Sequence, residues 1–227
     1  MQRHILTREL IETDGIDAIA ARDAPTLRIL SPSERATSLR ETLAERPEGD
    51  VWLFGYGSLI WNPSIQFAER RTARVEGWHR AFCLSALVGR GSMDNPGLVL
   101  GLDEGGSCAG VAFRIAEKML EAELSLVWKR EMLAAAYVPR WVDVRDDAGA
   151  RFGNAIAFTI DKAGRHYAGG LPENEAIQRI ATASGALGSS ADYLFQTCEG
   201  LRAHGIPDTE LEELAARVAA VQAAAAD

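Results

Sequence analysis

The chain has 227 residues, of which 47% are hydrophobic and 25% are charged. Its length suits one full-sized domain or two small ones, and its composition is that of an ordinary globular protein, which excludes a wholly disordered chain and a collagen-like repeat. The 24 Lys and Arg residues against 32 Asp and Glu residues give a net charge of −8. This balance argues against a nucleic-acid partner, because a phosphate backbone would repel it.

Cysteine usage and apolar segment length indicate the cellular setting. Cys83, Cys108 and Cys198 are widely spaced and form no Cys-x-x-Cys pair. Neither a disulfide framework nor a thiolate zinc site is therefore expected. No apolar stretch approaches the roughly 18 residues that a membrane helix needs, and residues 1–12 contain no apolar signal core. We expect a cytoplasmic protein with no membrane partner.

Residues 1–50 form a polar, charge-rich N-terminal arm. Asp14-Gly15 and Ser31-Pro32-Ser33 are breaks in this arm, and the apolar positions of residues 34–45 recur at helical spacing. We expect the arm to end in one short helix. The composition becomes apolar at Val51, and the apolar run 51–61 predicts a buried strand at the start of a domain.

The remaining pattern predicts strands followed by helices. Expected strands are 72–84, 97–102, 108–115, 137–144 and 154–160, and expected helices are 116–133, 173–184, 191–204 and 209–226. Asp103-Glu104-Gly105-Gly106 and Asp146-Asp147-Ala148-Gly149 have the composition of hairpin turns. The absence of regular β–α alternation indicates an α+β domain over residues 51–208 with a barrel-like mixed sheet. Residues 209–227 are expected to form a C-terminal helix packed on this domain.

The segment Gly55-Tyr56-Gly57-Ser58-Leu59 is the first candidate for chemistry. Two glycines at the end of a buried strand let the backbone turn sharply and bring successive N–H groups near an anionic ligand. The same pattern also fits a glycine-marked bulge in a core strand. It lacks the Gly-Lys-Ser/Thr of a phosphate loop and the Gly-x-Ser-x-Gly frame of a serine hydrolase.

Glu131 is the second candidate because of its position on a predicted helix. Leu120, Leu124, Val127 and Glu131 step by four, three and four residues, which places a carboxylate on an apolar stripe. Burial and the negative end of the helix would both raise its pKa toward the range of a general base, whereas Lys129 and Arg130 would oppose the shift. A frayed last turn with Glu131 exposed or paired is the alternative.

The other candidates carry weaker signals. The four histidines are scattered without metal-ligand spacing, so no metal site is expected. Arg90 lies in a glycine-punctuated loop and could offer its guanidinium to a carboxylate, although a solvated turn has the same composition. Tyr167 and Tyr193 could present hydroxyls to a pocket, or they could simply pack.

Taken together, these elements resemble the ChaC family of glutathione-specific γ-glutamylcyclotransferases. The resemblance covers about residues 51–202. Its most specific part is the string Phe-Gly-Tyr-Gly-Ser-Leu-Ile-Trp, and the later parts are Arg90-Gly91-Ser92, the Arg130-Glu131 pair and Asp192-Tyr193-Leu194. One departure lies at Met132-Leu133-Ala134-Ala135-Ala136, where the family usually has glycines.

The resemblance implies a γ-glutamylcyclotransferase-like fold, a small mixed β-barrel flanked by helices. It also implies that Glu131 is the catalytic carboxylate and that the Tyr-Gly-Ser-Leu loop holds the γ-glutamyl group through backbone N–H groups. No cofactor is expected, and the partner is a small molecule, glutathione. The candidate substrate-binding residues are Leu53, Phe54, Gly55, Tyr56, Gly57, Ser58, Leu59, Arg90, Tyr167 and Tyr193.

The expected reaction is attack of the γ-glutamyl α-amine on its own γ-amide carbonyl, which forms 5-oxoproline and releases Cys-Gly. Because the amine has a pKa of roughly 8, it needs a base at neutral pH, and Glu131 is expected to take its proton. Two alternatives remain open at this stage. One is a cyclotransferase for other γ-glutamyl amino acids or amines, and the other is a non-catalytic module that binds carboxylates.

Overall fold

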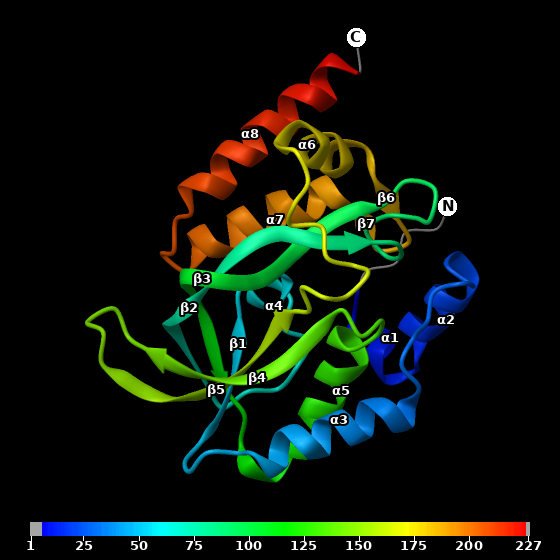
Figure 1. The fold of residues 1–227 in the computed structure, drawn as a ribbon. Helices are drawn as coiled ribbons and strands as arrows, with labels where there is room; N and C mark the ends of the chain where they lie inside the picture. Colours follow the sequence, from blue (N-terminus) through cyan, green and yellow to red (C-terminus); the bar gives the residue numbers. More distant parts are fainter. Residues whose placement is uncertain (1–5, 226–227) are drawn as a thin grey trace.

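We analysed a computed structural model that describes residues 6–225. In this part of the chain, five strands close into a barrel at the centre of the molecule (Figure 1). They are β1 (Val51–Gly55), β2 (Glu69–Ala86), β3 (Gly97–Arg114), β4 (Tyr137–Arg145) and β5 (Arg151–Ile160). The order is β1-β3-β2-β4-β5, and parallel pairing of β1 with β5 closes the ring. The other neighbouring pairs are antiparallel, so the predicted α+β fold with a mixed barrel is confirmed.

Strand β3 is longer than the sequence predicts. The expected hairpin at Asp103-Glu104-Gly105-Gly106 is wrong, because the two expected strands are one continuous strand paired along its length with β2. Gly105 and Gly106 have positive φ angles, and the pairing register shifts between Glu76 and Trp78 opposite them. The glycines therefore form a bulge, which bends the long β2–β3 ribbon around the barrel. The predicted hairpin at residues 146–149 is confirmed, since it joins antiparallel β4 and β5.

Helices cover two sides of the barrel (Figure 1). On one side, α6 (Glu173–Thr182), α7 (Ser190–Ala203) and α8 (Thr209–Ala224) contact one another, and the first two contact β3. A two-stranded hairpin of β6 (Ser184–Gly185) and β7 (Gly188–Ser189) precedes α7. On the other side lies α5 (Leu120–Glu131), which follows a 3₁₀ turn, η1 (Glu117–Met119). No described helix combines the length and the apolar character that spanning a bilayer requires.

The N-terminal arm contains more helix than the single one expected. Between residues 6 and 50 the structure has α1 (Arg8–Glu12), α2 (Gly15–Asp23) and α3 (Pro32–Ala44), and both α1 and α3 contact α5. The expected helix corresponds to α3, where Ser31 and Glu34 form a capping box. The first two helices are too short for a periodic pattern to predict them. They are stabilised by tertiary packing of Ile11 and Ile16 against Leu126.

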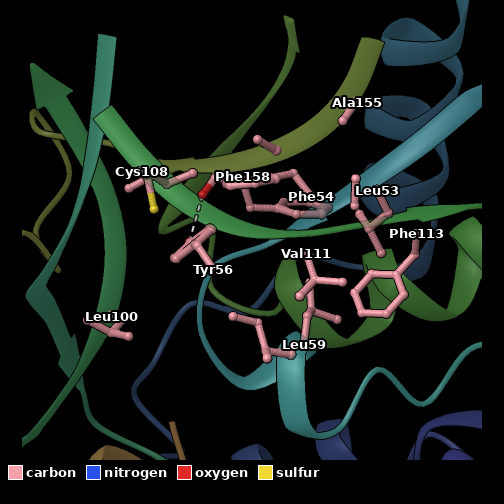
Figure 2. Packing of buried hydrophobic residues seen from close by; sticks show 14 of the residues in the cluster. Leu53, Phe54, Tyr56, Leu59, Leu100, Cys108, Val111, Phe113, Ala155 and Phe158 are labelled. Atoms are coloured by element: carbon pink, nitrogen blue, oxygen red, sulfur yellow. Dashed lines mark hydrogen bonds between the residues drawn. The ribbon is translucent and has the colours of Figure 1, made fainter. Parts of the chain in front are cut away.

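The hydrophobic core fills the barrel (Figure 2). Leu53 and Phe54 on β1 are completely buried, and they share this core with Phe113 on β3 and Phe158 on β5. Tyr56 follows β1 and donates a hydrogen bond of 2.8 Å from its hydroxyl to the Phe158 carbonyl oxygen. The end of β1 is therefore fixed to β5 by side-chain contacts as well as by backbone pairing.

Candidate active site

The turn after β1 lies at the centre of the candidate site. The expected strand over residues 51–61 ends at Gly55, and α4 (Ser58–Trp61) begins after the turn Tyr56-Gly57. A Cβ atom on Gly57 would lie 2.6 Å from the Tyr193 hydroxyl oxygen, which is too close for any real side chain. Glycine is therefore required here so that Tyr193, on α7, can approach the backbone of the turn.

Glu131 is the last residue of α5 and faces the same region. Its helix presents the predicted apolar stripe, because Leu120, Leu124 and Val127 are all buried. The Glu131 side chain is itself only 14% exposed. The alternative of a frayed, exposed Glu131 is therefore wrong, although the side chain is paired, with its neighbour Arg130.

Arg130 ties Glu131 to the turn after β1. Its Nε lies 2.9 Å from Oε1 of Glu131. Its Nη2 donates to the Ser58 hydroxyl at 2.8 Å, and its Nη1 donates to the Asn62 carbonyl oxygen at 2.5 Å. A guanidinium that is 5% exposed thus bridges the end of α5 and both ends of α4. This bridge fixes the carboxylate beside Ser58.

The environment of Glu131 opposes its ionisation. Burial raises the pKa of the carboxyl above its ordinary value, and the charge and hydrogen bond of Arg130 offset part of this rise. Lys129 is not among the causes of this shift, and its ammonium lies 2.6 Å from the Asp14 carboxylate of the arm. A buried carboxyl with a raised pKa is suited to accept and return a proton near neutral pH.

Three tyrosines surround the Glu131 carboxyl. Burial raises the pKa of Tyr193 to about 12, and it raises the pKa values of Tyr56 and Tyr137 well above their ordinary value. The nearby Glu131 charge adds to each of these shifts. All three hydroxyls therefore stay protonated at neutral pH. Those of Tyr56 and Tyr137 are oriented by hydrogen bonds to the Phe158 and Leu100 carbonyl oxygens.

Two connected hollows meet at Glu131. The inner recess, of about 20 Å³, is lined by the turn after β1 and by buried tyrosines: Tyr56, Gly57, Ser58, Leu59, Leu100, Glu131, Tyr137, Phe158 and Tyr193. The outer pocket, of about 200 Å³, shares Ser58, Glu131, Tyr137 and Tyr193 with the recess. The carboxyl thus lies where a ligand in the outer pocket could extend one small group into the recess.

Arg90 supplies a cation to the outer pocket. Its guanidinium lies 5.8 Å from the Trp61 ring centre and 5.9 Å from that of Tyr193, and Nη1 donates to the Ser189 carbonyl oxygen at 3.4 Å. Burial lowers the pKa of this guanidinium, although not enough to discharge it at neutral pH. A partly desolvated guanidinium between two rings can bind a ligand carboxylate. The solvated turn considered as an alternative for Arg90 does not form.

The structure brings together most of the predicted site residues. Tyr56, Gly57, Ser58, Leu59, Glu131 and Tyr193 line the recess, and Arg90 lines the outer pocket. Leu53 and Phe54 are instead core residues of β1 (Figure 2), and Gly55 packs against Leu59 and Phe113. These three residues can position the turn, but their place in the core does not favour direct substrate contact.

Tyr167 also lies outside both hollows. Its hydroxyl donates to Oδ2 of Asp103 at 2.7 Å, and the Lys162 ammonium lies 2.9 Å from Oδ1 of the same carboxylate. The backbone of this segment bonds to β2, since Ser85 N–H donates to the His166 carbonyl and Ala168 N–H donates to the Cys83 carbonyl. Tyr167 therefore holds a loop whose neighbouring residue, His166, lines the outer pocket.

Several lining residues were not predicted from the sequence. Tyr137 lines both hollows, but at the start of a strand its residue type is also typical of packing. For Arg130 the sequence indicates a charge next to Glu131 and one half of the Arg130-Glu131 pair, but not its bridge to α4. The pocket walls contributed by the arm, Leu6 and Leu27, carry no motif. The one signal available for Tyr137 is that a buried tyrosine hydroxyl needs a polar partner.

Comparison with known proteins identifies the family. The family model described as ChaC-like protein matches residues 51–221. The chain belongs to this family. A relative from Escherichia coli (strain K12), "Glutathione-specific gamma-glutamylcyclotransferase", is 46% identical over 212 residues, which cover 92% of this chain and 90% of the relative. "Glutathione-specific gamma-glutamylcyclotransferase 1" from Homo sapiens is 31% identical over 78% of this chain and 82% of the relative.

A solved structure supports the fold. A crystal structure of a γ-glutamyl cyclotransferase specific to glutathione from yeast has a TM-score of 0.69 to this chain. It is 20% identical, and the match covers 75% of this chain and 96% of the yeast chain. The match to the E. coli relative covers 92% of this chain, which is more than residues 51–227 can supply, so it includes part of the N-terminal arm.

Proposed function

We propose that this protein is a glutathione-specific γ-glutamylcyclotransferase that converts glutathione to 5-oxoproline and cysteinylglycine in the cytoplasm. The observation that carries the proposal is the Glu131 carboxyl at the junction of the two hollows, with a pKa raised by burial. Membership of the ChaC-like family and the two relatives named for this activity support the same reaction.

The reaction needs one proton acceptor and no protein nucleophile. The α-ammonium of the γ-glutamyl group loses a proton to the Glu131 carboxylate, and the freed amine attacks the γ-amide carbonyl carbon. A C–N bond forms to close the lactam, and the C–N bond to the cysteinyl nitrogen breaks. Glu131 then returns its proton to this leaving nitrogen. The attacking nitrogen loses its second proton as the lactam forms, and cysteinylglycine leaves with that proton as an ammonium. Because attack is intramolecular, the main task of the site is to hold the chain folded back on itself.

The geometry around Glu131 suits this task. We assign the γ-glutamyl end to the turn at Tyr56, Gly57 and Ser58, with its α-carboxylate facing the backbone of the turn. The recess of about 20 Å³ admits only one small group, so the remainder of the substrate must occupy the outer pocket. Arg90 lines that pocket, and we assign it to the glycine carboxylate of glutathione.

The test is direct measurement of products. Purified protein is incubated separately with glutathione, γ-Glu-Ala and γ-glutamyl-lysine, and 5-oxoproline and the released amine are quantified by mass spectrometry. We expect turnover of glutathione alone. Glu131→Gln keeps the shape of the side chain and removes the base, so turnover should fall by about 10²- to 10⁴-fold. Near-wild-type turnover in this variant would exclude the mechanism, and equal turnover of γ-Glu-Ala would exclude the specificity.

A further inference from the structure

The N-terminal arm forms part of the outer pocket wall. Leu6, which precedes α1, and Leu27, between α2 and α3, both line the pocket that also contains Arg90 and Glu131. Neither residue lies within the segment that the family model matches, which begins at residue 51. The pocket is therefore completed by residues from outside the catalytic barrel.

Hydrogen bonds fix both ends of this wall to the site. The Leu6 carbonyl oxygen accepts a bond of 2.7 Å from the side-chain amide of Asn62, whose backbone carbonyl accepts from Arg130. Further along the arm, Leu30 N–H donates to the carbonyl of Leu133, two residues after Glu131, at 2.8 Å. The two leucine side chains are thus held in place by the same segments that carry the catalytic groups.

Ion pairs hold the arm against α5 along its length. Arg8 binds both carboxylate oxygens of Glu123, at 2.7 and 3.0 Å, and the Glu123 side chain is completely buried. Asp14 pairs with Lys129, and Arg35 pairs with Asp17 and donates to the Lys129 carbonyl. These ion pairs and hydrogen bonds, some of them buried, keep the arm docked against α5 in the folded protein.

We propose that Leu6 and Leu27 bind the cysteinylglycine half of the substrate and set the affinity for it. This assignment rests on the proposed function, because it takes the γ-glutamyl end to lie at the recess. With that end beside Tyr56 and Gly57, the leaving half must extend into the outer pocket. The wall there is aliphatic, and the apolar parts of the leaving half are its cysteinyl side chain and its backbone methylene. Leu6 and Leu27 therefore act through contact with substrate, not through the chemistry at Glu131.

The experiment compares Leu27→Ala and Leu6→Ala with the wild-type protein. Dissociation constants for cysteinylglycine and for 5-oxoproline are measured by calorimetry, and KM and kcat for glutathione are measured in parallel. We expect the Kd for cysteinylglycine and the KM for glutathione to rise about three- to tenfold in each variant. The Kd for 5-oxoproline and kcat should stay within twofold of wild type.

Leu43→Ala is the matched control. Leu43 is a half-buried leucine of the arm that packs against the main core and is absent from the pocket wall. Its loss should lower the melting temperature without changing either Kd. Unchanged cysteinylglycine binding in both pocket variants would overturn the proposal, as would a selective loss of 5-oxoproline binding, which would reverse the substrate orientation. A wild-type protein that binds cysteinylglycine but releases no 5-oxoproline would instead refute the proposed function.

Discussion

Glu131 is held in an environment that favours its neutral form, and this has a consequence for pH dependence. Because burial raises its pKa in the folded state, the carboxylate that we propose as the base is lost as pH falls through a value above 4.5. We expect activity to decline below this raised value. Carbon NMR of labelled glutamate side chains, with Glu131→Gln to identify the resonance, measures the midpoint directly. A midpoint at or below 4.5 would contradict this prediction.

The same shift affects stability in the opposite direction. A carboxyl whose pKa is higher in the folded state than in the unfolded state binds more protons when folded, so its contribution to stability falls as pH rises through that window. Glu131→Gln removes this penalty and can still accept a hydrogen bond from Arg130. The variant should therefore have a melting temperature at pH 8 no lower than that of the wild-type protein.

Gly57 and Tyr193 make a second prediction at the residue scale. Gly57→Ala places a methyl group 2.6 Å from the Tyr193 hydroxyl, and the next nearest atoms lie at 3.6 Å. The turn or α7 must shift, and we expect kcat/KM to fall by about 100-fold. In a Tyr193→Phe background the clashing oxygen is gone, so adding Gly57→Ala should cost much less. Equal losses in both backgrounds, measured as a double-mutant cycle, would argue against the clash.

At this scale the sequence singled out Glu131 more clearly than the residues around it. Glu131 was recognisable because a carboxylate on an apolar stripe breaks a pattern. Tyr137 breaks no pattern, since a tyrosine at the start of a strand is ordinary. Phe54 begins the motif string and Leu53 precedes it, but both lie on β1, where every position is buried, so the fold places them in the core.

The loop between α5 and β4 contains backbone strain at a position where the sequence departs from the family pattern. Ala135 has a φ of 51°, in the left-handed region that favours glycine, and it lies in the segment where the family usually has glycines. Ala135→Gly should relieve this strain and stabilise the protein by about 1 kcal/mol, which raises the melting temperature by roughly 2–4 °C.

Ala134→Gly is the control for this loop. Ala134 is not among the described non-glycine residues with positive φ, so the extra freedom of glycine in the unfolded chain should make this change neutral or destabilising. Urea unfolding of both variants tests the difference. A loss of stability in Ala135→Gly as large as that in Ala134→Gly would show that no strain is stored at position 135.

Helices and strands are predictable where residues close together in the sequence determine them. Helical periodicity and breaks in the pattern predict α3, α7 and α8 to within a few residues. The sequence predicts a hairpin at the bulge of Gly105 and Gly106, because paired glycines after acidic residues are typical of both structures. A bulge and a hairpin turn are distinguished only by the partner strand. Here β2 pairs with β3 on both sides of the two glycines, which identifies a bulge.

At the scale of the whole molecule, one buried ion pair contributes to the attachment of the arm. Glu123 is fully buried, and Arg8, which is 33% exposed, is its cationic partner. Arg8→Met leaves the carboxylate without its counterion, and we expect a loss of about 2 kcal/mol, less than for a fully buried pair. Adding Glu123→Gln should recover much of this loss. Urea unfolding of the four proteins gives the coupling energy, and additive effects would contradict it.

The overall architecture was partly readable from the sequence. Separate runs of strands and helices predicted the α+β class, and the resemblance implied the barrel. The docking of the arm was not predictable, because it depends on pairs such as Arg8 with Glu123 that lie far apart in the sequence and belong to no repeated pattern. Long-range ion pairs leave no local signal.

The site is assembled from segments spread over most of the chain, from Leu6 of the arm to Tyr193 of α7. During synthesis, the arm and the turn after β1 leave the ribosome long before the tyrosine that closes the recess. An incomplete nascent chain therefore contains Glu131 without its full surroundings. We expect products that terminate before Tyr193 to leave the glutathione of the cell intact, so that this activity begins only after α7 has been synthesised.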